Sequence, residues 1–200
     1  MIKKFIISNS MKTIKSYYPN YDTEQLERIQ YGLEALYLSI TKVIVIIILA
    51  IILGIIKEAI IILLLFNVLR MTAFGIHATK SWMCWITSLP TFIGIPLICK
   101  YCSVPIYVLL GIAIASLISF IFFAPADTIK RPLIRKKRRV IYKTLTIIIG
   151  TLYLILIIFS KNEFLQSALA FSMLIEAILI CPLTYKMFNM SYNNYKTFKM

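Results

Sequence analysis

The sequence predicts an all-α membrane protein: a polytopic helix bundle of about six spans, preceded by amphipathic helices that lie at the membrane surface. The 200 residues are 60% hydrophobic and 15% charged, and the mean hydropathy is +0.85. Soluble domains contain about 25% charged residues. The apolar residues gather in long, nearly uncharged runs such as "KVIVIIILAIILGII", and charged residues flank these runs. Runs of this kind form helices in lipid, so a soluble globular fold is excluded.

The N-terminal region, residues 1–42, differs in character from the membrane domain expected over residues 43–200. It opens with "MIKKFIISNSMKTIKSYY", which mixes lysines with large apolar side chains, as an interfacial helix on an anionic membrane surface does. Asp22 and Gln25 then have the spacing of a capping box. Apolar residues follow at helical spacing and predict a second amphipathic helix leading into the first span: Leu26, Ile29, Leu33, Leu36 and Ile40.

The distribution of positive charge predicts six spans with both termini in the cytoplasm. This threading places 19 of the 22 Lys and Arg residues on the cytoplasmic side, as the positive-inside rule requires. We expect the second span to continue past Arg70. We expect the third span to be kinked, because it contains Pro90 and Pro96. The predicted spans cover residues 43–56, 59–69, 85–99, 104–123, 144–160 and 164–181.

One polar stretch, "RMTAFGIHATKSWMC" at residues 70–84, interrupts the apolar runs. It contains Arg70, Cys84 and the only histidine of the chain, His77. Seven residues along a straight helix separate two side chains by about 10 Å, so His77 could approach Cys84 only where the chain bends. Gly75 permits such a bend. Ser81 is suited to cap a helix whose first turn carries Cys84, and a helix N-terminus favours the thiolate form of cysteine.

These residue types together suit nucleophilic catalysis by Cys84 with His77 as the general base. The simpler interpretation makes His77 an interfacial imidazole and Cys84 a small packing residue. Arg70 is an ionisable group at membrane depth, which is costly without a partner or a task. A single histidine excludes a multi-histidine zinc site, and the chain has no glycine-rich phosphate loop. No metal and no cofactor are therefore expected.

Two acidic residues lie near or within the predicted spans. Glu176 is in the middle of the last span. Intramembrane acids are commonly functional, but Glu176 could simply pair with a Lys or Arg of a neighbouring helix. Glu34 lies on the helix before the first span, where it could face the site or only the surface. Cys99 and Cys102 form a C-x-x-C without a second pair, and we interpret that spacing as accidental.

Four stretches, distributed over nearly the whole chain, resemble parts of one known family. They are "YGLEALYLSITK", "RMTAFGIHATKSWMC", "FAPADTIKRPLIRKKRR" and "LIEAILICPL". They are similar, in this order, to the segment before the first span, the Arg…Gly-x-His-Ala…Cys core, the Ala-Pro-Ala plus basic loop and the Ile-Glu-Ala…Pro of the last span in the accessory gene regulator B (AgrB) membrane endopeptidases. One departure is Phe74, where the family usually has the first glycine of Gly-Gly before x-His.

The resemblance implies that Cys84 is the nucleophile and His77 its general base, with Arg70 and Gly75 supporting the site. It implies a quorum-sensing propeptide (AgrD-like) as the substrate. The C-terminal tail of that propeptide would be removed through a Cys84 thioester, and the rest cyclised as a thiolactone or lactone. It further implies a homodimer. The threading predicted from charge places residues 70–84 at the cytoplasmic face of the bacterial plasma membrane, in contact with membrane lipids, and no nucleic-acid partner is expected.

Two other functions remain open: a small membrane transporter or exporter without peptidase activity, and a non-catalytic receptor or scaffold. The spans contain few charges and no repeated pair of broken helices, which disfavours a transporter. The basic run "KRPLIRKKRR", residues 130–139, also has two interpretations. It could fix orientation and bind anionic lipid, or Arg135, Lys136 and Lys137 could hold an acidic tail of the precursor. Likewise, residues 1–42 could be a plain anchor or could capture the precursor.

Overall fold

The computed structural model describes residues 2–19, 21–76, 81–128 and 133–196. These residues form helices joined by short links, and an isolated β-bridge joins Phe74 to Ala126. The predicted all-α class is confirmed. The chain divides into two compact units, Met1–Leu49 and Ala50–Met200.

The first unit consists of α1 (Ile2–Tyr17) and the N-terminal part of α2 (Thr23–Ile52). Gln25 forms its half of the expected capping box, since its Oε1 accepts the Asp22 backbone N–H at 3.1 Å. The predicted second amphipathic helix is confirmed as the start of α2, which continues without a break into the first apolar run. α2 ends at Ile52, a few residues before the predicted end of the span, where Gly54 with φ +65° turns the chain.

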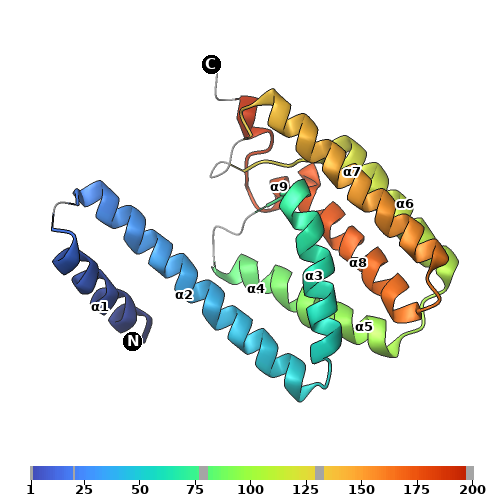
Figure 1. The fold of residues 1–200 in the computed structure, drawn as a ribbon, viewed down its shortest axis with the longest axis horizontal. Helices are drawn as coiled ribbons and strands as arrows, with labels where there is room; N and C mark the ends of the chain where they lie inside the picture. Colours follow the sequence, from blue (N-terminus) through green and yellow to red (C-terminus); the bar gives the residue numbers. More distant parts are fainter. Residues whose placement is uncertain (1, 20, 77–80, 129–132, 197–200) are drawn as a thin grey trace. The chain divides into compact units, whose positions relative to one another are not determined.

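The second unit is a bundle built around α8 (Glu163–Ile180), which contacts α3, α5, α6, α7 and α9 (Figure 1). The other helices are α3 (Ile56–Ala73), α4 (Ser81–Leu89), α5 (Ile95–Tyr101), α6 (Ile106–Phe123), α7 (Lys136–Phe159) and α9 (Pro182–Met187), with a π-helical turn at Pro90–Gly94 and a 3-10 turn at Asn194–Lys196. Small buried residues on α8 allow its neighbours to approach closely: Ser167, Ala168, Ala170, Ser172 and Ala177.

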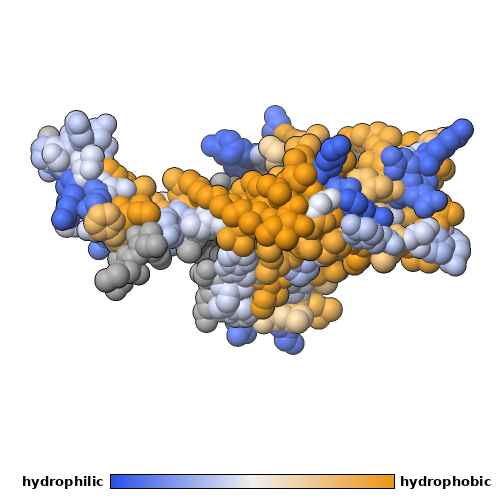
Figure 2. All heavy atoms as spheres, turned by 90° about the horizontal axis from the view of Figure 1, so that it is seen from below, coloured by the Kyte–Doolittle hydropathy of each residue, from blue (hydrophilic) through white to orange (hydrophobic). Residues whose placement is uncertain are grey.

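Within the described residues, four helices are long and apolar enough to span a membrane: α2, α6, α7 and α8. α3 continues past Arg70, as expected, but it also carries Lys57 and Glu58 near its start. The third predicted span is interrupted by the π-helical turn that begins at Pro90, so the expected irregularity is confirmed. Figure 2 shows a broad hydrophobic surface over the helices. The total of six spans stays a prediction.

Candidate active site

The predicted catalytic stretch connects α3 to α4 in the second unit. Arg70 lies in the last turn of α3, and Gly75 lies in the link that follows. Cys84 is in the first turn of α4, as predicted. Ser81 is the first residue of α4, one position later than a cap. His77, with residues 78–80, is outside the described residues, as are the side chains of Ser81 and Cys84.

Arg70 is the centre of a buried polar cluster. Its Nη1 atom lies 3.5 Å from Glu176 Oε1 on α8. Its Nη2 atom donates to the Ile76 carbonyl oxygen, one residue before His77. The Glu176 side chain is fully buried and that of Arg70 is 17% exposed. A charge at this depth requires a partner, so each ion makes the burial of the other tolerable.

Backbone hydrogen bonds fix the path of the link up to Ile76. Ala126 donates its N–H to the Ala73 carbonyl and accepts the Gly75 N–H, both at 2.9 Å. The Ile76 N–H donates to the Leu179 carbonyl near the end of α8 at 3.2 Å. Ala73, Ile76 and Ala126 are buried. The chain therefore enters residue 77 from a backbone position held on two sides.

Two consecutive residues in this link have positive φ. Gly75 has φ +87°, and a Cβ atom there would lie 2.4 Å from Arg70 Nη1 and 3.0 Å from the Leu179 oxygen. Phe74 has φ +65° and ψ −105°, a sparsely populated backbone conformation that costs a side-chain-bearing residue about 1–3 kcal/mol. Its ring packs edge-on against Tyr142, with centroids 4.9 Å apart. This geometry gives a physical reason for a Gly-Gly pattern at positions 74 and 75.

The other end of the catalytic stretch is attached to the same part of the bundle. Trp82, two residues before Cys84, has its ring centroid 6.4 Å from that of Phe188, which follows α9. Ile76 is bonded to the end of α8, and only the Cys181 link separates α8 from α9. Ile76 thus contacts the C-terminal end of α8, and Trp82 contacts the residue that follows α9.

The structure also reveals Asp127, which sequence reasoning did not single out. This buried carboxylate accepts three backbone N–H groups: Asn194 to Oδ1 at 2.8 Å, and Tyr195 and Leu133 to Oδ2 at 2.9 and 3.3 Å. The Tyr185 hydroxyl lies 3.1 Å from the carbonyls of Ala126 and Asp127. The available sequence signal was one acidic residue beside a strongly basic run. Asp127 ties the C-terminal segment to the residues that pair with the catalytic link.

The remaining predicted residues do not converge on this link. Of the basic residues proposed to hold a precursor tail, Lys136 lines a pocket beside the start of α7. Arg135 is the N-cap residue of α7, and neither it nor Lys137 is among the described residues that line that pocket. Glu34 belongs to the first unit, where it lines a separate pocket with α1 residues such as Lys12. Within the described residues, no group of three His, Cys, Asp or Glu could hold a metal ion.

Comparison with known proteins identifies the family. The family model described as Accessory gene regulator B matches residues 7–180. The chain belongs to the accessory gene regulator B family. A putative AgrB-like protein of Clostridium acetobutylicum is 31% identical over 175 residues, which are 88% of this chain and 84% of that protein. Accessory gene regulator protein B of Staphylococcus aureus (strain MRSA252) is 32% identical over 170 residues, 83% of this chain and 88% of that protein.

A putative AgrB-like protein of Listeria innocua is similar to the same extent, with 31% identity over 182 residues, 89% of this chain and 87% of that protein. No solved structure matches the chain. Family membership assigns the chain a role in the accessory gene regulator quorum-sensing system. Together with the four helices suited to span a membrane, it supports a membrane protein.

Proposed function

We propose that the protein is a membrane cysteine endopeptidase and cyclase that removes the C-terminal tail of an AgrD-like quorum-sensing propeptide. Cys84 is the nucleophile and His77 the general base. The observation that carries the proposal is the fixed backbone at Ile76, held by Leu179 and Arg70 one residue before His77. Effective catalysis requires such positioning, since a displacement of about 1 Å can reduce a rate by about 10²-fold.

The reaction proceeds in two steps, acylation of Cys84 and ring closure. The Cys84 thiolate attacks the scissile carbonyl, the C–N bond breaks, and protonated His77 gives its proton to the departing amine. A thiol or hydroxyl of the bound propeptide then attacks the Cys84 thioester and transfers its proton to His77. The second attack closes a thiolactone or lactone and regenerates the Cys84 thiolate. Exchange between two thioesters is nearly isoenergetic, so exclusion of water is needed to favour the ring over hydrolysis.

Four further residues support the catalytic pair, and the protein's surroundings complete the proposal. Arg70 and Gly75 act as positioning residues, because they fix the backbone rather than touch the substrate. Ser81 begins the helix that carries Cys84. Glu176 acts through Arg70 as its partner. The protein works as a homodimer in the plasma membrane, with both termini and the active site at the cytoplasmic face.

Four charged residues are proposed to contact the propeptide. Arg135, Lys136 and Lys137 are the candidates for holding an acidic propeptide tail. Glu34 and its lysine-containing pocket are a candidate contact for the rest of the propeptide.

The decisive experiment is mass analysis of the protein in lipid vesicles after addition of a candidate precursor. We expect an acyl adduct on the peptide that contains Cys84. Cys84→Ala should remove the adduct and tail release, whereas the control Cys102→Ala, at an exposed cysteine, should leave both unchanged. His77→Gln should slow tail release by at least about 10²-fold. Tail release by Cys84→Ala above background would refute the nucleophile assignment.

Alkylation of the thiols at neutral pH separates the enzyme from a transporter or scaffold. An activated Cys84 should react much faster than exposed Cys102, partly exposed Cys181 or buried Cys99. If Cys84 reacts no faster than Cys102, exposure alone explains its reactivity and the catalytic proposal loses its chemical basis.

A further inference from the structure

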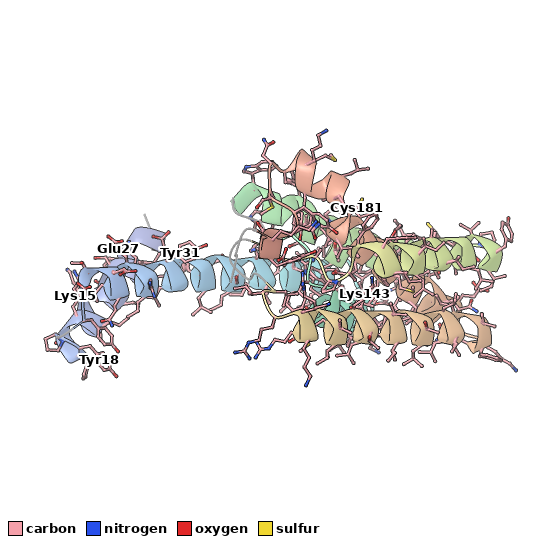
Figure 3. All side chains as sticks on the ribbon, turned by 90° about the horizontal axis from the view of Figure 1, so that it is seen from above. Lys15, Tyr18, Glu27, Tyr31, Lys143 and Cys181 are labelled. Carbon is pink, nitrogen blue, oxygen red and sulfur yellow. The ribbon has the colours of Figure 1, made fainter. Side chains whose placement is uncertain are left out.

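The start of α7 borders a pocket that plays no part in the proposed chemical steps. The pocket has a volume of about 540 Å³ and lies between the end of α6, the first two turns of α7, the start of α9 and the C-terminal segment. Lys136, Arg139 and Lys143 line it. At about 100° per residue these three positions fall on one face of the helix. Figure 3 labels Lys143 on α7.

The positive charge of this pocket is not neutralised by nearby acids. No Asp or Glu is among the described residues that line it. The ion pairs Arg28–Glu24, Arg70–Glu176 and Lys100–Glu58 lie elsewhere in the described part of the chain, and none of these three involves α7. Asp127 is close in sequence, but its two oxygens accept backbone N–H groups and it is 2% exposed. An anion would therefore meet three cations on one helix face, with no acidic side chain among the described residues that line the pocket.

The far wall of the pocket is held in place by the C-terminal segment. The guanidinium of Arg139 lies 3.6 Å from the ring centroid of Tyr195. The Tyr195 backbone N–H donates a hydrogen bond to Asp127 Oδ2. The Tyr192 hydroxyl donates to the Phe123 carbonyl at 3.3 Å. Burial raises the pKa of Tyr192 to about 12, so this hydroxyl stays protonated at neutral pH. Both tyrosines line the pocket, so hydrogen bonds and ring stacking fix its far wall.

One side of the pocket continues into an apolar surface suited to acyl chains. Phe122 and Val140 line the pocket and are 72% and 57% exposed. They lie at the end of α6 and the start of α7, two helices suited to span a membrane. Beyond them, exposed apolar side chains continue along the same two helices, among them Ile118, Ile141 and Leu145. This apolar edge favours an anion that carries acyl chains over a purely polar anion.

We propose that the pocket formed by Lys136, Arg139, Lys143 and Tyr195 binds the phosphate headgroup of an anionic phospholipid, whose acyl chains lie along the apolar faces of α6 and α7. The three cations supply the charge-assisted hydrogen bonds to the phosphate oxygens, and Phe122 and Val140 border the first part of the chains. The proposal does not depend on the peptidase activity, because none of these residues belongs to the proposed catalytic machinery.

The test compares two charge-matched triple variants of the full chain in lipid nanodiscs. The pocket variant is Lys136→Gln, Arg139→Gln and Lys143→Gln; the control is Arg135→Gln, Lys137→Gln and Arg138→Gln, whose positions do not line the pocket. Binding of phosphatidylglycerol is measured by titration into phosphatidylcholine nanodiscs. The loss of three charge-assisted hydrogen bonds to the phosphate predicts that the pocket variant binds at least about tenfold more weakly, whereas the control, which makes no such bonds, binds within about threefold of the parent.

Equal losses in the two variants would show that diffuse charge binds the lipid. Displacement of the lipid by millimolar inorganic phosphate would make free phosphate the ligand. Unchanged lipid binding together with a raised KM for the precursor in the pocket variant would assign the pocket to an acidic peptide. Arg139→Lys keeps the charge but loses the planar stacking on Tyr195, so it should weaken lipid binding by less than the triple change. Unaltered helical circular dichroism checks that the variants fold.

Discussion

Arg70 and Asp127 each gather backbone groups beside Ala126, but they differ in how their charge is satisfied. Arg70 donates hydrogen bonds to the Ile76 carbonyl and to the carboxylate of Glu176, which lies 106 residues further along the chain. Asp127 accepts three backbone N–H groups, and among the described residues it forms no ion pair. Within the described residues, Glu176 Oε2 accepts no hydrogen bond.

This difference shows what each cluster is suited to do. Asp127 resembles a structural anchor, because several modest hydrogen bonds to one carboxylate hold a terminal segment in place. The Arg70–Glu176 pair is costly to bury and gives little net stability compared with apolar residues of the same size. A buried pair of that kind is better explained by the position that Arg70 gives the Ile76 carbonyl. The following variants test this contrast.

Removal of Arg70 should have the largest effect. In Arg70→Met, Glu176 is left buried and unpaired, so the free energy of unfolding should fall by about 3–5 kcal/mol. The Ile76 carbonyl also loses its donor, and tail release should fall by about 10²-fold. Both are measured in vesicles, by denaturant unfolding and by single-turnover cleavage of the precursor.

The double variant Arg70→Met, Glu176→Leu separates stability from positioning. Replacing both charges with apolar residues should restore most of the stability but not the cleavage, because Ile76 still lacks its donor. Recovery of cleavage to the parental rate would show that the pair is only a stabilising contact.

The second effect concerns Gly75. In Gly75→Ala the new Cβ atom would lie 2.4 Å from Arg70 Nη1 and 3.0 Å from the Leu179 oxygen, at a φ of +87°. The new Cβ would displace the Arg70 guanidinium from Glu176 and Ile76, and the positive φ strains alanine, so cleavage should fall by about tenfold or more. Gly111→Ala on α6 is the control, because a Cβ there meets nothing within 4 Å; it should keep full activity. Normal cleavage by Gly75→Ala would remove the argument for a fixed link.

Asp127→Asn should have an intermediate effect, mainly on the C-terminal segment. The amide keeps one accepting oxygen and loses the other, which should cost about 1–3 kcal/mol. Limited proteolysis should then cut the chain after residue 190 faster than in the parent, while cleavage of the precursor falls less than in Arg70→Met. A larger loss of cleavage than in Arg70→Met would reverse the roles assigned to the two clusters.

Phe74→Gly should have the smallest effect. Glycine relieves the strain at φ +65°, and this offsets the lost ring contact with Tyr142, which is worth about 0.5–1.5 kcal/mol. Cleavage should stay within about threefold of the parent in the same vesicle assay. A loss greater than tenfold would indicate that the Phe74 side chain itself contacts the substrate.

Much of the architecture could be predicted because it depends on local sequence. The length of the apolar runs predicted the helices of the bundle, and Pro90 predicted an interruption in the third run, since proline removes a backbone donor. The placement of Cys84 in the first turn of a helix was also a local inference. The site motif could be recognised because its residues are close in the chain, from Arg70 to Cys84.

The sequence by itself thus determined the helical class, the membrane character and the residues proposed for catalysis. Only the tertiary structure decided which distant groups support them: Glu176 as the partner of Arg70, Ala126 and Leu179 as the holders of the link, and Asp127 as the anchor of the C-terminal segment. The physical reason is that such pairs form between helix ends far apart in the chain. Their rotation and depth are set by side-chain packing over the whole bundle, which no local pattern encodes.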